Sequence, residues 1–143
     1  MVIVGSGSQE RRLKGIAKKN IIFRGSLSDM ELKKTYSACR AVILPQKEDF
    51  GLVALEANAS GKPVICYGQG GVKTTMIKYN GYNEDSATAI FYDRQEVDDL
   101  IEAVSRFNIV DFNKEALIAN AGRFEKNLFM RRIKEIIIEN SIS

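Results

Sequence analysis

Histidine is absent from the 143-residue sequence, which excludes a histidine base in catalysis and metal sites built on imidazole. The two cysteines, Cys39 and Cys66, lack zinc or redox spacing and adjoin apolar runs, so we expect buried free thiols, as in a reducing cytoplasm. No apolar run approaches the ~20 residues of a membrane span. No signal peptide or dense basic cluster is evident, so we expect neither a secretory leader nor a nucleic-acid partner. No cluster of metal ligands stands out, and we expect no metal site.

The composition is that of a globular protein with one core. Apolar residues make up 45% of the chain and charged residues 27%, with a formal net charge of +3. This mildly basic balance suits phosphate ligands or an acidic membrane surface. Strands alternate with helices, and no repeat or linker interrupts them. The pattern predicts an α/β fold, a Rossmann-like parallel sheet with helices on both faces, in a single domain over residues 1–143.

The segment 40–66 (RAVILPQKEDFGLVALEANASGKPVIC) is the centre of this prediction. Its apolar run, stopped by Pro45, predicts a strand buried on both faces. A helix is expected over 52–60 and a second strand over 63–66, which together make a βαβ unit. The expected helix carries three apolar residues at helical spacing: Leu52, Leu55 and Ala59.

The start of this helix is a candidate anion site. The first turn of a helix leaves about four backbone N–H groups unpaired, with partial positive charge. Gly51 has no side chain, so an anionic group can approach the N–H groups of Gly51, Leu52 and Val53. Glu48 precedes the helix and Glu56 lies in its second turn. Because carboxylates accept hydrogen bonds from hydroxyls, we expect both to face a sugar or a ribose diol.

The same residues carry a family resemblance. Glu48 and Glu56 are separated by seven residues, and EDFGLVALEANASGKPVI resembles the Glu-x7-Glu motif of retaining GT-B glycosyltransferases (glycosyl transferases group 1). The resemblance implies that Glu48 is a catalytic residue that holds the donor sugar and that Glu56 binds the ribose. It implies that the amides of Gly51, Leu52 and Val53 bind the diphosphate and stabilise the leaving group. It implies a GDP- or UDP-linked donor as substrate, with no cofactor and no metal.

Four further residues are donor-binding candidates. Gly5 and Gly7 follow the first strand, where the resembled family faces its nucleotide sugar; a simple tight turn is the alternative. Arg24 lies in the region that resembles the family's base-recognition segment, and an ordinary surface arginine is equally compatible. Lys73 follows a glycine-rich loop that carries an acid in the family. Thr74 replaces that acid here, so a phosphate contact and a solvated lysine both stay open for Lys73.

The C-terminal third is predicted to be helical. We expect a helix over 95–107 and two C-terminal helices within about 113–140. The inner face of the first is expected to hold Val97, Leu100, Ile101 and Val104, and that of the last Phe124, Leu128, Ile133, Ile136 and Ile137. Its basic residues Lys126, Arg131, Arg132 and Lys134 are expected to be solvated, with a peripheral contact at the inner membrane face or with a partner as the alternative.

The leading hypothesis is a donor domain that moves a sugar from a nucleoside diphosphate sugar to a glycan or lipid-linked acceptor. The tail resembles polysaccharide mannosyltransferases, which favours mannose and GDP. By the same resemblance, the chain lacks the first strand–helix unit and the N-terminal acceptor domain, so alone it is expected to be inactive and to bind its donor weakly. The alternatives are glucosyl transfer of the glycogen or sucrose synthase type and a non-catalytic Rossmann-like binding or regulatory module.

Overall fold

The computed structural model describes residues 1–141, and the chain divides into two compact units, one ending at Ala38 and the other beginning at Cys39. Each unit contains parallel strands and helices, so the predicted α/β class is confirmed. The single domain expected over 1–143 stays a prediction. The two units are described separately below.

The first unit is a small βαβ arrangement followed by a helix. Its elements are β1 (Val2–Ile3), α1 (Glu10–Ile16), β2 (Ile22–Phe23) and α2 (Asp29–Ala38). The two strands pair in parallel, with Val2 opposite Ile22. The sequence pattern of Ser28 and Glu31, three residues apart, predicts a capping box, and this box opens α2: the backbone N–H and the hydroxyl of Ser28 donate to Oε2 of Glu31 at 2.9 and 2.6 Å. These bonds lower the pKa of the Glu31 carboxyl.

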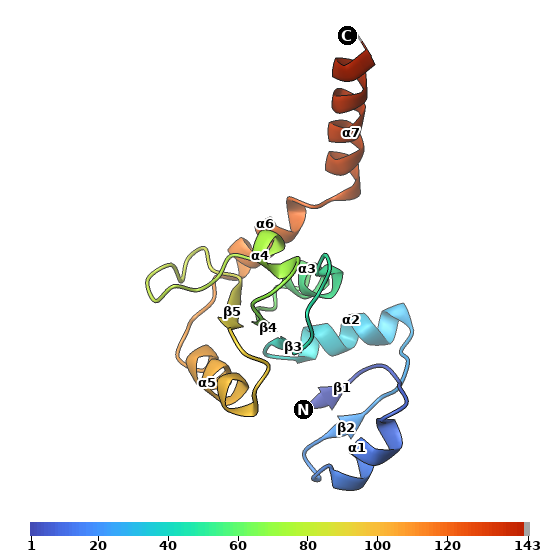
Figure 1. The fold of residues 1–143 in the computed structure, drawn as a ribbon, viewed down its shortest axis with the longest axis vertical. Helices are drawn as coiled ribbons and strands as arrows, with labels where there is room; N and C mark the ends of the chain where they lie inside the picture. Colours follow the sequence, from blue (N-terminus) through green and yellow to red (C-terminus); the bar gives the residue numbers. More distant parts are fainter. Residues whose placement is uncertain (142–143) are drawn as a thin grey trace. The chain divides into compact units, whose positions relative to one another are not determined.

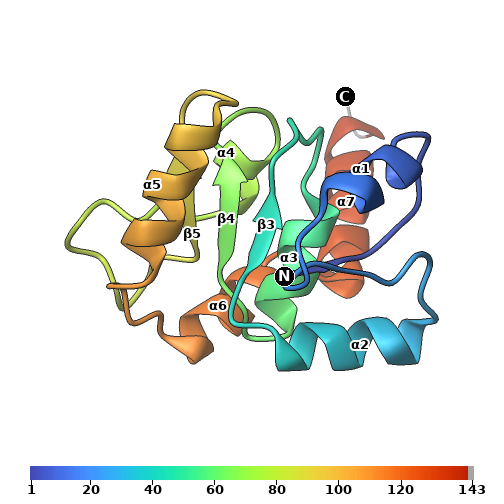
Figure 2. The same cartoon turned by 90° about the horizontal axis from the view of Figure 1, so that it is seen from below.

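The second unit is built on a three-stranded parallel sheet in the order β3-β4-β5 (Figures 1 and 2). The strands are β3 (Val42–Leu44), β4 (Val64–Tyr67) and β5 (Ala89–Tyr92), and the helices are α3 (Leu52–Ala59), α4 (Val72–Thr75), α5 (Val97–Phe107), α6 (Lys114–Gly122) and α7 (Lys126–Ser141). Helix α5 covers one face of the sheet, while α3, α4 and α6 lie on the other (Figure 1). Helices on both faces of a parallel sheet are the predicted arrangement. The carboxyl ends of all three strands therefore meet at one edge.

The core of this unit is centred on strands β4 and β5, which are almost completely buried. Ile65, Ile90 and Tyr92 pack against Ala103 of α5. Cys66 is buried in the same sheet, whereas Cys39 is half-buried, and neither cysteine forms a disulfide bond. The buried thiol expected at Cys66 is confirmed, and Cys39 is only partly covered.

Two helices bury faces that differ in part from those expected. In α3, Leu52 is 63% exposed and Ala59 is exposed, while only Leu55 of the predicted stripe is buried. In α5, Leu100 and Val104 pack against the core as expected, whereas Val97 and Ile101 are exposed, because the packed face centres on Ala103 and places those two residues at its margin. The buried face of α3 consists of Ala54, Leu55, Ala57 and Asn58.

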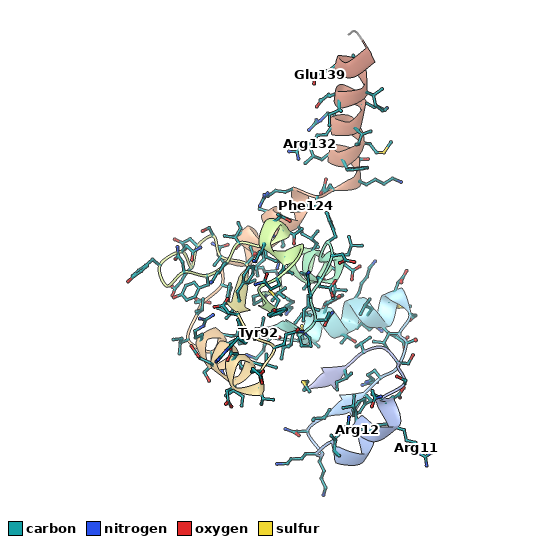
Figure 3. The ribbon with its side chains drawn as sticks, viewed as in Figure 1. Arg11, Arg12, Tyr92, Phe124, Arg132 and Glu139 are labelled. Carbon is teal, nitrogen blue, oxygen red and sulfur yellow. The ribbon has the colours of Figure 1, made fainter. Side chains whose placement is uncertain are left out.

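Helix α7 is confirmed as a helix, but its predicted inner face is largely exposed. Ile133, Ile136 and Ile137 are all exposed, and so are Arg132 and Glu139 (Figure 3). Only Phe124, before the helix, and Leu128 are half-buried among the expected set. Among residues 1–141, no helix combines the length and apolar character that crossing a membrane requires.

Candidate functional site

The backbone at Gly51 forms the start of α3. Gly51 occupies the N-cap with φ +89° and ψ 39°, a left-handed conformation that favours glycine, and no side chain caps the helix. Leu52 and Val53 are exposed. The first turn thus presents backbone N–H groups without a side-chain acceptor, which suits an anionic ligand.

A side chain at position 51 would also lack room. A Cβ there would lie 3.2 Å from Oγ1 of Thr75 and 3.5 Å from Cγ1 of Val72. The start of α3 is therefore pressed against α4. Glycine is required here both by the backbone dihedral and by this contact.

Glu48 lies in the loop between β3 and α3, and its side chain is half-buried. Nε2 of Gln46 donates a hydrogen bond to Oε1 of Glu48. The backbone of Glu48 forms a parallel bridge with Gly70, and its carbonyl accepts a 2.7 Å hydrogen bond from the N–H of Gly71. The loops that follow β3 and β4 are thus joined through their backbones.

The glycine-rich loop after β4 allows this close approach. A Cβ at Gly70 would overlap the carbonyl oxygen of Glu48, and one at Gly71 would overlap the backbone of Phe50. The sequence predicts unusual dihedrals or a close ligand approach for this loop. The structure shows a left-handed Gly70, at φ +80°, and a close approach to the protein's own backbone.

Glu56 and Lys73 complete the predicted positions in this unit. Glu56 is exposed and lies one turn beyond Leu52, so both occupy the same outer face of α3. Lys73 is exposed on α4, and its Nζ donates a 2.8 Å hydrogen bond to Oε1 of Gln69. Glu48, Glu56 and the start of α3 therefore belong to one loop–helix segment, while Lys73 contacts its own loop.

The remaining predicted positions lie in the first unit. Gly5, with φ +105°, donates from its N–H to the carbonyl of Gly25 at 2.7 Å. Arg24 precedes Gly25, and its backbone N–H donates a hydrogen bond to the carbonyl of Ile3. Gly7 is exposed and its carbonyl accepts from the first turn of α1. Gly5 and Arg24 thus lie together at the carboxyl ends of β1 and β2.

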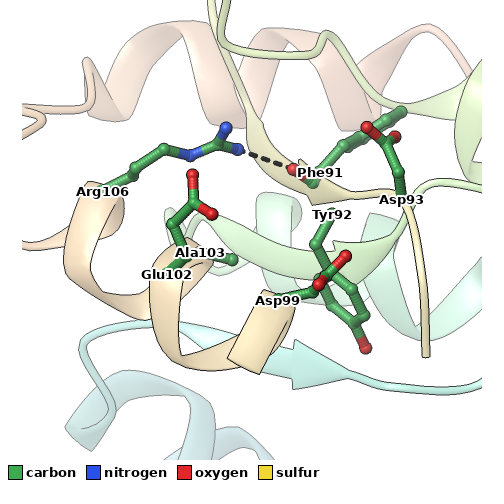
Figure 4. A pocket seen from close by; sticks show the side chains of 7 residues that line it. All are labelled: Phe91, Tyr92, Asp93, Asp99, Glu102, Ala103 and Arg106. Carbon is green, nitrogen blue, oxygen red and sulfur yellow. Dashed lines mark hydrogen bonds between the residues drawn. The ribbon is translucent and has the colours of Figure 1, made fainter. Parts of the chain in front are cut away.

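A small hollow between β5 and α5 contains none of the predicted residues (Figure 4). Its volume of about 70 Å³ is well below the roughly 300 Å³ at which ligand pockets begin. Nη2 of Arg106 donates to the carbonyl of Phe91 at 2.6 Å and ties α5 to the sheet. The hollow lies beside this contact between α5 and the sheet, and it is too small for a nucleotide.

Sequence reasoning missed a set of fully buried polar residues beneath the site: Asn58, Thr75 and Asn120. Each lies on a helix that packs on the same side of the sheet. A signal was present, because Asn58 and Asn120 interrupt otherwise small and apolar helical segments. Such buried amides need hydrogen-bond partners, which the sequence alone does not identify.

Comparisons with known proteins identify the family. The model of the family described as glycosyl transferases group 1 matches residues 1–127. The chain is 35% identical to a D-inositol 3-phosphate glycosyltransferase from Actinosynnema mirum, over 75% of this chain and 24% of that protein. It is 30% identical to an alpha-1,3/1,6-mannosyltransferase from Eremothecium gossypii, over 82% of this chain and 23% of that protein. The chain thus spans about a quarter of the length of these curated relatives.

A solved structure gives the same result for the fold. Sucrose-phosphate synthase from Thermosynechococcus elongatus is 27% identical and superimposes with a TM-score of 0.60, over 91% of this chain and 38% of that chain. The chain therefore belongs to the glycosyl transferases group 1 family, and its fold is that of GT-B glycosyltransferases.

Proposed function

We propose that this chain is the donor-binding part of a retaining glycosyltransferase that moves mannose from GDP-mannose to a glycan or lipid-linked acceptor. The observation that carries the proposal is the left-handed, uncapped Gly51 at the start of α3, which lies seven residues after the end of β3 and closes the loop that contains Glu48. The similarity to a mannosyltransferase over 82% of the chain supports the choice of sugar. Acceptor binding would be the task of a further domain, as the greater length of the relatives suggests.

In this proposal the start of α3 binds the diphosphate. The N–H groups of Gly51, Leu52 and Val53 donate to its oxygens, and the helix dipole favours the negative charge that grows on the leaving group. Glu48 accepts hydrogen bonds from hydroxyls of the donor sugar, and Glu56 accepts them from the ribose. This electrostatic assistance uses no histidine, in keeping with the composition.

We also propose secondary contacts for the remaining candidates. Gly5, Gly7 and Arg24 would approach the nucleoside, because Gly5 and Arg24 lie at carboxyl ends of parallel strands, where such folds bind ligands. Lys73 would leave Gln69 to meet a phosphate oxygen. Loss of one such charged contact is expected to weaken binding without abolishing it.

Calorimetric titration of the chain with GDP, UDP and ADP tests the proposal. We expect GDP to bind most tightly and Glu56→Ala to weaken it roughly 10- to 100-fold, because a hydrogen bond to a charged group contributes about 1.5–3 kcal/mol. Glu135→Ala, which removes an exposed glutamate from α7, is the matched control and should bind as the parent does.

Other outcomes assign the donor differently. A preference for UDP would overturn the mannosyl assignment and favour glucosyl transfer, which the similarity to sucrose-phosphate synthase supports. Equal affinity in Glu56→Ala and the parent would remove Glu56 from the site. Binding of no nucleotide would favour a non-catalytic module.

A further inference from the structure

A buried amide near the end of α6 connects three helices. Asn120 is 2% exposed, and its Nδ2 donates to Oδ1 of Asn58 on α3 at 2.9 Å and to the carbonyl of Thr75 on α4 at 2.8 Å. Its Oδ1 accepts from Nη1 of Arg123 at 3.0 Å. Both hydrogens of the Asn120 amide are therefore used, as expected for a buried polar group.

Thr75 extends this network to the candidate site. Its hydroxyl donates to the carbonyl of Gly71 at 3.0 Å. The Thr75 Oγ1 atom also limits the space beside Gly51. The N–H of Gly71 in turn donates to the carbonyl of Glu48. A continuous series of contacts thus runs from Asn120 through Thr75 to both ends of the Glu48–Gly51 loop.

A second contact reaches the middle of that loop from the same end of α6. Phe124 meets the ring of Phe50 edge-on, with 6.0 Å between ring centroids. Arg123, which holds Asn120, also lies over the ring of Phe124 at 5.4 Å. The end of α6 therefore contacts the loop through a polar route and an aromatic route.

We propose that Asn120 is a positioning residue for the Glu48–Gly51 loop. A leucine of similar size would fill the space between α3 and α6, but hydrophobic packing has no directional requirement. The amide fixes the direction of the Thr75 carbonyl, and Thr75 then sets the distance between the Gly71 turn and Gly51. The functional part of this inference rests on the proposed donor site, because it assumes that the loop binds the nucleotide sugar.

Native-state hydrogen exchange of the full chain separates this role from simple stability. In Asn120→Leu, the Gly71 amide is expected to exchange at least tenfold faster relative to the Ile65 amide of the central strand. GDP affinity is expected to fall about tenfold. The matched control is Leu117→Ala, which opens a cavity on the same helix and removes none of the hydrogen bonds of Asn120. Its loss of stability should raise exchange at both amides alike and leave GDP affinity within twofold of the parent.

Thr75→Val provides a second variant if Asn120→Leu does not fold. It keeps the shape of the side chain and removes one of the two hydroxyls that donate to the Gly71 carbonyl, so the Gly71 amide should again lose protection selectively. Unchanged relative exchange at Gly71 in the folded variant would overturn the positioning role. If the parent binds no nucleotide, the proposed function fails, whereas the exchange result still decides whether the network holds the loop.

Discussion

The contact between Gly70 and Glu48 gives a quantitative prediction through Gly70→Ala. The left-handed φ of +80° is unfavourable for alanine, and the new Cβ would overlap the Glu48 carbonyl oxygen. Lys47 also approaches, with its Cγ 3.2 Å from the Cβ position. The loop after β3 must therefore move away from the loop after β4.

The free-energy cost has two parts. A residue held in an unfavourable backbone conformation costs about 1–3 kcal/mol. Displacement of the Glu48 carbonyl breaks its bond to the Gly71 N–H, which removes roughly 0.5–1.5 kcal/mol more. The matched control is Gly81→Ala: its φ is +100°, yet no atom lies within 4 Å of a Cβ there. Gly70→Ala should therefore lose about 1 kcal/mol more stability than Gly81→Ala.

Urea denaturation measures both losses, and titration with GDP measures the effect on the site. We expect Gly70→Ala to bind GDP more weakly than the parent, since its Glu48 loop is displaced, and Gly81→Ala to bind it normally. Equal destabilisation by the two substitutions would refute the steric argument. Full GDP affinity in Gly70→Ala would refute the link between this turn and the site.

Two further predictions do not depend on the proposed function. Asp99 accepts hydrogen bonds from Nη2 and Nε of Arg94 at 2.8 and 3.1 Å, which lowers the pKa of the Asp99 carboxyl. A carboxyl whose pKa is lower in the folded state than in the unfolded state stabilises the fold at pH values above its unfolded-state pKa of about 3.9. This stabilisation is lost as the pH falls through the folded-state pKa. In urea titrations, Asp99→Asn should thus be less stable than the parent at pH 7, and the difference should shrink as the pH falls below about 3.9; a constant difference would contradict this. Burial raises the pKa of the Cys66 thiol to about 12, so a thiol reagent at pH 8 should modify the half-buried Cys39 first and Cys66 only on unfolding. Two thiols of equal reactivity would count against the buried position of Cys66.

The order and type of elements around the candidate site could be predicted from sequence. The apolar run stopped by Pro45 is β3, and the run from Val64 is β4, because parallel strands buried on both faces need continuous apolar sequence. Helix α3 lies between them as expected. Asn113 caps α6 with its side-chain oxygen, 3.0 Å from the N–H of Ala116, and asparagine is one of the residues preferred at this position.

The orientation of the helices could not be predicted in the same way. Apolar periodicity shows that a stripe exists, but small residues decide how closely a helix approaches its neighbour. Ala54 and Ala57 of α3 are completely buried, whereas the larger Leu52 and Val53 point outward. Ala103 has the same effect in α5. In both helices, some of the large apolar residues of the predicted face are exposed, whereas alanines occupy the buried face.

The site itself combines a local motif with distant support. Glu48 and Gly51 lie three residues apart, so their relation is visible in the sequence. The residues that hold them are not adjacent: Gly71 is joined to Glu48 across 23 positions, and Asn120 reaches the loop through Thr75. A local sequence motif therefore does not by itself specify the geometry on which donor binding would depend. Transplanting the β3–α3 segment into another parallel sheet should reproduce the exposed helix start but not the position of Glu48, since that position depends on glycines and a buried amide elsewhere in the chain.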